Sequence, residues 1–205
     1  MAAPGPLCGT TAESIDAGTL CRHRAVTPGP TTGATSVTEK QRLLDEKELA
    51  RLREIRKLVH DNNKSTLDDN VIICQIYMES RFDARAGATH DAKGLMQMQL
   101  NAVRQAYKYR KQGELGHMPN EKETTAAFAE AKTLHDSPSI MDEATNIQIG
   151  TEYMQYWLDN TSSVEDAYKR YRGKQNGIYY SKIKSAADKL AANPESIQVL
   201  RDMVK

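Results

Sequence analysis

The chain has 205 residues, with 28 Lys and Arg against 27 Asp and Glu, so its formal net charge is +1 at pH 7. A near-neutral chain has no strongly basic surface, so no nucleic-acid partner is expected. No apolar run approaches the roughly 18 residues that a membrane-spanning helix requires, so no membrane span is expected either. A chain of this length can bury a substantial core, which predicts one domain with short additions.

Residues 1–37 are rich in small residues and hold four of the seven prolines and five of the twelve glycines. With so few large apolar side chains, the segment cannot bury enough surface to offset the entropy of ordering, so we expect a mobile leader. It lacks a basic stretch followed by about 7–15 apolar residues, so a Sec-type signal peptide is not expected. The protein would then be made in the cytoplasm and stay there, or leave by another route.

Three cysteines are too few for a disulfide framework. Cys8 and Cys21 both lie in the leader, and they could pair only in an oxidising compartment. Cys74 lies in an apolar run, which predicts a buried, unreactive thiol. No CxxC or HExxH motif occurs and the five histidines are scattered, so neither a metal site nor a cofactor is expected.

The first helix is predicted from residue 38 to about 60, followed by a turn at 61–64. Residues 38–41 fit a capping box, and leucine, isoleucine and valine then recur at helical spacing among mixed charges. Residues 38–66 therefore form an amphipathic helix and turn that precede the main domain, residues 67–205. The charged face of this helix is expected to be solvated, with a partner-binding role as the alternative.

The next helix is predicted to begin at Ser65 or Thr66 and to contain residues 71–78, which are apolar nearly all round. Such a run is typical of a helix buried on all sides. It leads into Glu79, and apolar surroundings disfavour an ionised carboxyl group and raise its pKa. A glutamate that is protonated near neutral pH can give a proton to a leaving oxygen, as glycosidic bond cleavage requires. The alternative is a solvated helix-end glutamate, or one paired with Arg81.

The remaining elements are predicted to be helices joined by loops. Residues 83–93 are small and polar, which indicates a loop or a small irregular hairpin, and a second loop is expected over 111–125. Helices are predicted over 94–110, 123–134, 146–160 and 179–192. Another is predicted to start from a capping box at 162–165 and to end before a loop at 173–177, and a last one is predicted to start from an N-cap at Asn193. No convincing strand is found, so the predicted fold class is mainly α.

Two blocks of sequence resemble a known family. Residues 79–83 (Glu-Ser-Arg-Phe-Asp) and, eleven residues on, residues 94–98 (Gly-Leu-Met-Gln-Met) resemble the Glu-Ser-x-Phe and Gly-Leu-Met-Gln segments of lysozyme-like lytic transglycosylases of the soluble type. Later blocks at 146–154 and, more loosely, at 167–183 resemble further family segments in the same order. The resemblance covers residues 67–185 and implies a lysozyme-like fold, with a buried central helix that ends in the catalytic glutamate and a small loop or hairpin.

The resemblance also implies an activity and a mechanism. Glu79 would protonate the glycosidic oxygen of the MurNAc-β-1,4-GlcNAc bond in peptidoglycan glycan strands. It would then act as a base toward the 6-hydroxyl of the same muramyl sugar, which closes a 1,6-anhydro ring. This route needs no second enzymic carboxylate, because the substrate supplies the nucleophile.

Four residues of the two blocks are expected to form the cleft. Ser80 and Gln97 would hydrogen-bond the sugar or the catalytic glutamate, with a helix-end role for Ser80 and a loop-holding role for Gln97 as the alternatives. Met96 and Met98 would form the apolar floor of the cleft, with a purely core role as their alternative.

Later residues and the departures from the family pattern complete the expected site. Tyr171 would match the tyrosine whose hydroxyl reaches toward the glutamate, or else pack with that hydroxyl on a carbonyl, and Asn146 would be a wall or packing residue. Arg172 stands where the family has asparagine, which leaves room for hydrolysis by water. An inverting hydrolase needs a second carboxylate about 6.5–9.5 Å from the acid. Asp83 and Asp91 are the candidates, with turn formation as their alternative role.

Other interpretations stay open. Residues 104–143 look longer than the family's connection and would form a lid, a substrate-binding arm or a partner surface. Without a Sec signal, a wall-degrading enzyme would need another route to the periplasm of a target cell. One route is type VI secretion as an antibacterial toxin, which would have a cognate immunity protein. The other interpretation is a phage-type muralytic enzyme. The alternatives are an N-acetylglucosaminidase and, in another class, an inactive lysozyme-like module that binds glycan or protein.

Overall fold

The computed structural model describes residues 32–205, with side chains from residue 38 onward. Within these residues the chain forms eight α-helices and one 3-10 helix. It contains no strand there beyond one isolated antiparallel bridge between Lys93 and Met98. The predicted mainly α class is confirmed. Residues 1–31 of the predicted leader, with Cys8 and Cys21, lie outside the described residues.

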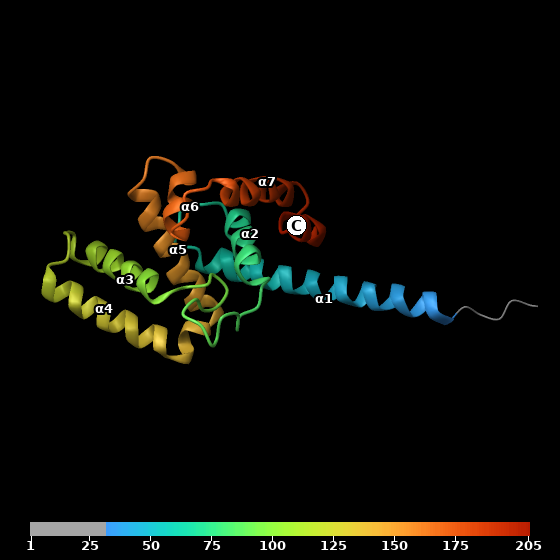
Figure 1. The fold of residues 1–205 in the computed structure, drawn as a ribbon, viewed down its shortest axis with the longest axis horizontal. Coiled ribbons are helices and arrows are strands. Elements are labelled where there is room, and N and C mark those ends of the chain that lie inside the picture. Colours follow the sequence, from blue (N-terminus) through green and yellow to red (C-terminus); the bar gives the residue numbers. More distant parts are fainter. Residues whose placement is uncertain (1–31) are drawn as a thin grey trace, which may run out of the picture.

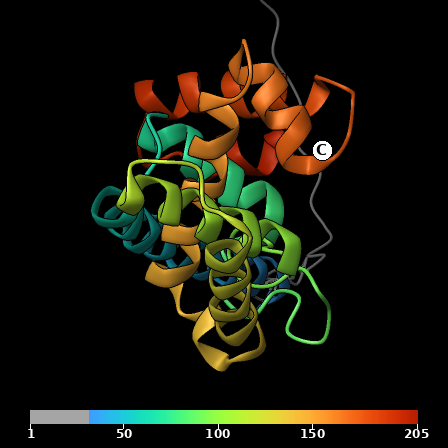
Figure 2. The same ribbon diagram turned by 90° about the vertical axis from the view of Figure 1, so that its left-hand side faces the viewer.

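The helices follow one another along the chain with short connections. They are α1 Thr32–Asn62, α2 Asp69–Ser80, α3 Leu100–Leu115, α4 Glu121–Asp136, the 3-10 helix η1 Pro138–Met141, α5 Glu143–Asp159, α6 Val164–Arg172, α7 Ile178–Ala192 and α8 Ile197–Met203. Helix α2 lies at the centre, with α5, α6 and α7 around it, while α3 and α4 pack side by side as a hairpin that reaches away from the body (Figure 1). Figure 2 looks onto this hairpin end of the molecule.

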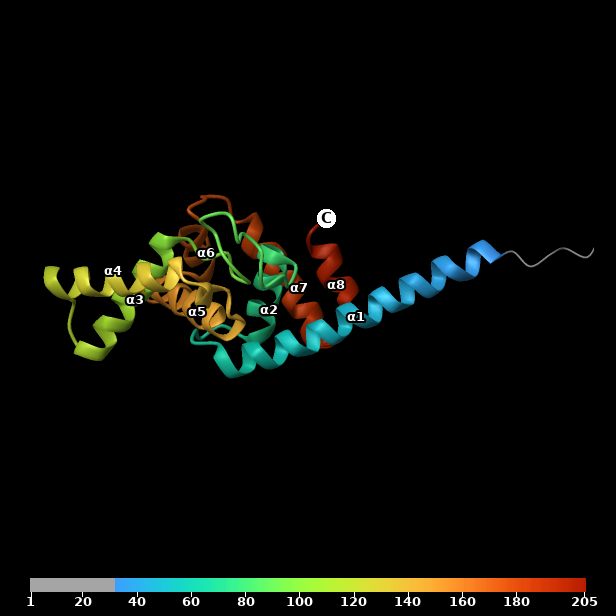
Figure 3. The same ribbon diagram turned by 90° about the horizontal axis from the view of Figure 1, so that it is seen from below.

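Helix α1 belongs to the core over only part of its length. Leu52, Ile55 and Val59 are buried against the rest of the fold, because α1 packs there on α2 and α5. Residues 38–47 are exposed, and the N-terminal half of the helix extends beyond the body (Figure 3). No helix in the described part of the chain is both long and apolar enough to cross a lipid bilayer.

Helix α2 is the buried centre that the apolar run predicts. It packs against α1, α7 and α8, and its buried residues are Ile72, Ile73, Cys74, Gln75, Ile76, Tyr77 and Ser80. Burial raises the pKa of the Cys74 thiol to about 12. The predicted burial of this cysteine is confirmed, and a thiol that stays protonated is expected to be a poor nucleophile.

Several predicted helix starts were wrong because a neighbouring polar side chain provides the cap instead. Asp68, not Ser65 or Thr66, caps α2, and its carboxylate accepts a hydrogen bond from the Asn70 amide at 2.8 Å. Ser163 caps α6 through the Asp166 amide, one residue later than predicted. A short polar side chain at each of these positions can accept the free amide of the first turn, so sequence alone does not choose among them.

Other boundaries also differ from the predictions. Helix α1 begins at Thr32, ahead of the predicted start at residue 38, and Ser196, not Asn193, caps α8. Residues 94–98 are not helical, because the backbone pairing between Lys93 and Met98 folds them into a tight turn. The predicted loop at 111–125 is much shorter, since α3 continues to Leu115 and α4 begins at Glu121.

Candidate functional site

A cavity of about 330 Å³ lies where the end of α2 meets the turn before α3 and the end of α6. It brings together the two sequence blocks that the resemblance singles out, since Glu79 and residues 96–98 all line it. The full lining consists of Glu79, Ala92, Met96, Gln97, Met98, Gln99, Asn101, Ala102, Tyr153, Tyr171, Arg172 and Lys174.

Glu79 lies in the last turn of α2 and is largely buried. Burial raises the pKa of its carboxyl group above the ordinary value. Three neighbours act in the opposite direction: the Tyr179 hydroxyl, which donates a hydrogen bond to Oε1 of Glu79, and the positive charges of Arg172 and Lys174. Desolvation is the largest of these effects, so the site favours the protonated acid.

The chain turns sharply after Glu79. Arg81 and Phe82 both have positive φ angles, 55° and 66°, which residues other than glycine rarely adopt. The turn is held from α1, because the Arg51 guanidinium donates to the Phe82 carbonyl oxygen at 3.2 and 3.0 Å and also pairs with Glu143 at the start of α5. Backbone strain that the surrounding structure maintains is common at functional sites.

The predicted alternative of an ion pair between Glu79 and Arg81 does not form. The Arg81 guanidinium instead donates to the carbonyl oxygens of Tyr77 at 2.6 Å and Met78 at 3.1 Å in the last turn of α2. The carboxyl group of Glu79 therefore faces the cavity lining and Tyr179.

The floor of the cavity is formed by the turn before α3. Met96 and Met98 are buried and line the cavity, so they serve both the core and the floor. Gln97 also lines the cavity, but its side-chain amide donates to the Gly94 carbonyl oxygen at 2.8 Å. That bond supports the left-handed backbone of Gln97 (φ 49°), so the loop-holding role is present as well.

Asn146 is fully buried on α5 and holds this turn from behind. Its Oδ1 accepts from the Met96 amide at 2.8 Å, and its Nδ2 donates to the carbonyl oxygens of Lys93 at 3.0 Å and Ile140 at 2.9 Å. It does not belong to the cavity lining. Of its two predicted roles, wall or packing, Asn146 has the packing role.

Tyr171 lines the cavity, but its hydroxyl donates to the Met96 carbonyl oxygen at 3.1 Å. The tyrosine that bonds Glu79 is Tyr179, in the first turn of α7. Of the two roles left open for Tyr171, the hydroxyl on a carbonyl is confirmed. The contact with the glutamate comes from Tyr179 instead, because which helix packs across the end of α2 is not visible in the sequence.

Besides Asn146, three further predicted site residues lie away from the cavity lining. Ser80 is buried, and its hydroxyl donates to the Ile76 carbonyl oxygen at 3.1 Å, so it has the helix-end role. Asp83 accepts from the Arg85 amide at 2.8 Å, and Asp91 lies 3.6 Å from the ring of the buried His135. Both aspartates are exposed and shape loops, so neither is placed as a second carboxylate.

Sequence reasoning missed the basic side of the cavity. Arg172 and Lys174 line it, and the Arg172 guanidinium carbon lies 4.0 Å from the centre of the Tyr179 ring. Arg172 was noted only as a departure from the family pattern. The sequence signal that could have identified Arg172 as a site residue is its positive charge directly after Tyr171, which was expected in the cleft.

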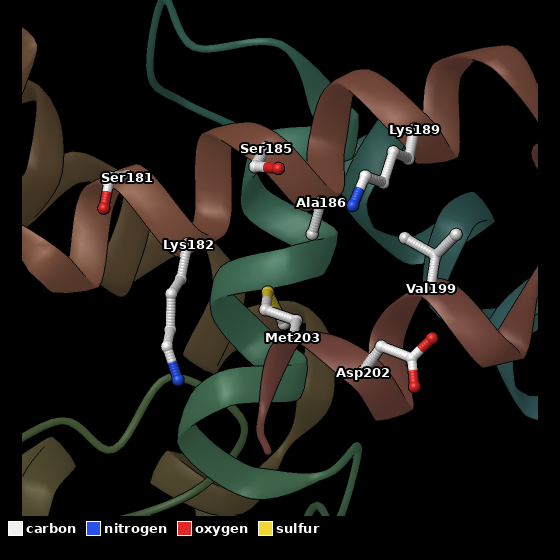
Figure 4. Close-up of a pocket in the computed structure, with 8 residues that line it drawn as sticks. All are labelled: Ser181, Lys182, Ser185, Ala186, Lys189, Val199, Asp202 and Met203. Atoms are coloured by element: carbon white, nitrogen blue, oxygen red, sulfur yellow. The ribbon is translucent and has the colours of Figure 1, made fainter.

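Two other cavities contain carboxylates that are paired with a basic side chain. One lies between α7 and α8 and is lined by Ser181, Lys182, Ser185, Ala186, Lys189, Val199, Asp202 and Met203 (Figure 4). Its carboxylate, Asp202, is exposed and paired with Lys205. Another, beside α3, contains Glu152, which is paired with Arg110 at 2.7 Å. The hydrogen bond from Lys205 lowers the pKa of Asp202, whereas burial raises the pKa of Glu79.

The segment 104–143 forms most of α3, all of α4 and η1. It packs on α5, while Asn101 and Ala102 at the start of α3 reach the cavity lining. Within the described residues, no three His, Cys, Asp or Glu side chains lie close enough together to hold a metal ion. Comparison of the chain with protein families, with curated proteins and with solved structures found no match.

Proposed function

We propose that the protein cleaves the glycan backbone of peptidoglycan at the MurNAc-β-1,4-GlcNAc bond, with a lysozyme-like domain and Glu79 as the only enzymic acid and base. The observation that carries this proposal is the Glu79 carboxyl group itself. It lies at the end of the buried central helix, burial raises its pKa, and it borders a cavity of about 330 Å³.

The surroundings of Glu79 suit both halves of the reaction. A protonated carboxyl group accepts a hydrogen bond on one oxygen and donates from the other. Since the Tyr179 hydroxyl donates to Oε1, the acidic proton belongs on Oε2, from which it passes to the glycosidic oxygen. The carboxylate that results is stabilised by the same Tyr179 and by the charges of Arg172 and Lys174, and it can then act as the base.

The cavity favours the lytic route over inverting hydrolysis. Among the described residues, Glu79 is the sole carboxylate in the lining, and Asp83 and Asp91 lie outside it. An inverting hydrolase requires a second carboxylate to activate water. In the lytic route the 6-hydroxyl of the muramyl sugar attacks instead, and Glu79 accepts its proton.

The test is Glu79→Gln, which keeps the size of the side chain but cannot donate the proton. We expect solubilisation of purified peptidoglycan to fall by at least about 100-fold, the usual contribution of a general acid. Glu130→Gln, on the exposed side of α4, is the matched control and should keep the wild-type rate. A Glu79→Gln variant that digests peptidoglycan at the wild-type rate would refute the proposal.

Product analysis then defines the reaction. Mass spectrometry of the released fragments should show 1,6-anhydromuramyl ends, whereas reducing muramyl ends would indicate hydrolysis. Reducing N-acetylglucosamine ends would identify the protein as a glucosaminidase that uses the same acid on the other glycosidic bond. Binding of glycan by the wild-type protein without any product would favour the inactive lysozyme-like module.

A further inference from the structure

Two cations, Arg172 and Lys174, border the cavity beside Glu79. In the part of the chain that the structure describes, the side chains of Arg172 and Lys174 form no salt bridge, whereas Lys169, on the same helix as Arg172, pairs with Glu165 and Asp166.

Arg172 is also held in place. Its guanidinium carbon lies 4.0 Å from the centre of the Tyr179 ring, and the hydroxyl of that ring bonds Glu79. A guanidinium group over an aromatic face gains cation–π attraction and loses less freedom when it binds a ligand. Arg172 is half-buried, and Lys174 lies exposed two residues further along.

The charge balance of the cavity depends on the state of Glu79. When Glu79 is protonated, as the general acid must be, the described lining carries two positive charges and no negative one. Uncompensated cations in a concave, partly dry site attract anions, and a planar guanidinium matches the geometry of a carboxylate.

We propose that Arg172 and Lys174 form a subsite for a carboxylate of the substrate, next to the bond that Glu79 protonates. This inference rests on the proposed function and narrows it to glycans whose sugars carry acidic groups. Two groups of peptidoglycan have the required chemistry: the carboxylates of the peptide stems, and the lactyl carboxylate that becomes free when a stem is removed. Neutral polymers of β-1,4-linked N-acetylglucosamine lack both and are poor substrates.

The experiment compares three preparations of the same peptidoglycan. One is native, one has its carboxylates converted to neutral methylamides with a carbodiimide, and one has its stems removed by an amidase so that the lactyl carboxylates are free. Loss of a charge-assisted hydrogen bond typically costs about tenfold or more. We expect kcat/KM of the wild type to fall by about tenfold on the amidated material, and activity on the stripped material decides which carboxylate is recognised.

Variants of Arg172 and Lys174 test whether these two cations cause the preference for native over amidated peptidoglycan. Arg172→Gln with Lys174→Gln should cut native and amidated material at the same low rate. Lys174→Gln alone, at an exposed position that cannot disturb the core, should lose part of the discrimination. Lys182→Gln, an exposed lysine outside this cavity, is the control and should discriminate as the wild type does.

A binding measurement separates this inference from the proposed function. The Glu79→Gln variant should sediment with native sacculi more than with amidated sacculi, whether or not catalysis is observed. Equal cleavage of native and amidated material by the wild type overturns the subsite and leaves the proposed function intact. Discrimination that persists in the double variant also overturns it. A wild type that cuts none of the three preparations overturns the proposed function, and the binding of Glu79→Gln to native and amidated sacculi then decides whether the carboxylate subsite exists.

Discussion

The Tyr179 hydroxyl donates a hydrogen bond to Oε1 of Glu79 across 100 residues of sequence. The bond connects the first turn of α7 to the last turn of α2, the two helices that pack at the centre of the fold. It stabilises the carboxylate, whereas burial of Glu79 stabilises the neutral acid. The acidity of Glu79 is therefore set by two opposing effects, and each can be changed by one substitution.

Removing the tyrosine hydroxyl should make Glu79 a weaker acid. In Tyr179→Phe the carboxylate loses a donor while burial stays, so the pKa of Glu79 rises further. The general acid must be protonated, so activity falls as the pH rises through that pKa. We expect the falling limb of the pH profile of kcat/KM on peptidoglycan to move to higher pH in this variant.

Tyr180→Phe provides the control for this prediction. Tyr180 follows Tyr179 in the first turn of α7, and its ring stacks on Tyr168 of α6 with ring centres 5.0 Å apart. The hydrogen bond to Glu79 comes from Tyr179. Its variant should keep the wild-type pH profile. A limb that stays in place, or moves to lower pH, in Tyr179→Phe would show that the hydroxyl does not control the acid.

The same burial predicts that Glu79 costs stability. A carboxyl group whose folded-state pKa is raised binds more protons in the folded state, so stability falls as the pH rises from the ordinary pKa of 4.5 through the folded-state value. Glu79→Gln removes this loss. We therefore expect its free energy of unfolding at pH 7 to exceed the wild-type value.

Urea denaturation at several pH values checks this prediction. The advantage of Glu79→Gln should shrink as the pH falls and disappear below about 4.5, where the carboxyl group is protonated in both states. Glu130→Gln should change the free energy of unfolding by less than about 0.5 kcal/mol throughout, as is usual for an exposed position. A pH-independent difference would mean that the carboxyl group does not titrate as burial requires.

Much of the site can be predicted from sequence because its chemistry is local. The apolar run before Glu79 predicts a buried helix and an acid of raised pKa, which needs only the periodicity of one helix. That residues 96–98 line the same cavity was expected from the family resemblance of the two blocks, not from spacing alone.

The remaining features depend on contacts that no local pattern encodes. Tyr179 reaches Glu79 only because α7 packs on α2, and Arg172 becomes part of the cavity only because α6 ends beside it. The left-handed backbone of Gln97 is equally hidden, since that conformation is rare outside glycine and depends on the bond to Gly94. The basic wall of the cavity was therefore missed, and so was the tyrosine that bonds Glu79.

Asn146 should be critical for both folding and activity. Asn146→Ala leaves the Met96 amide without its acceptor and removes a donor from the carbonyl groups of Ile140 and Lys93, of which Lys93 keeps the Met98 amide; an unsatisfied buried polar group costs about 1–3 kcal/mol. We expect the variant to lose about 3 kcal/mol of stability in urea denaturation. Asn160→Ala, which removes one exposed bond to the Tyr156 carbonyl, should cost less than about 0.5 kcal/mol. Equal costs for the two variants would contradict the assignment.

A pair of glycine substitutions tests how closely the cavity floor packs on α5. A Cβ at Gly150 would lie 2.4 Å from the Met96 sulfur and 2.9 Å from its Cβ, so rotation of the methionine cannot relieve the clash. Overpacking of this kind costs about 1–3 kcal/mol, and the displaced Met96 should also lower activity on peptidoglycan.

Gly113 on α3 is the matched control, because a Cβ there would meet nothing within 4 Å. Alanine at a helix-interior glycine with free space should stabilise by about 0.5–1 kcal/mol. The two Gly-to-Ala changes should therefore shift the urea midpoint in opposite directions, with activity lowered only by Gly150→Ala. A stabilised and fully active Gly150→Ala would show that Met96 does not pack against α5 as described.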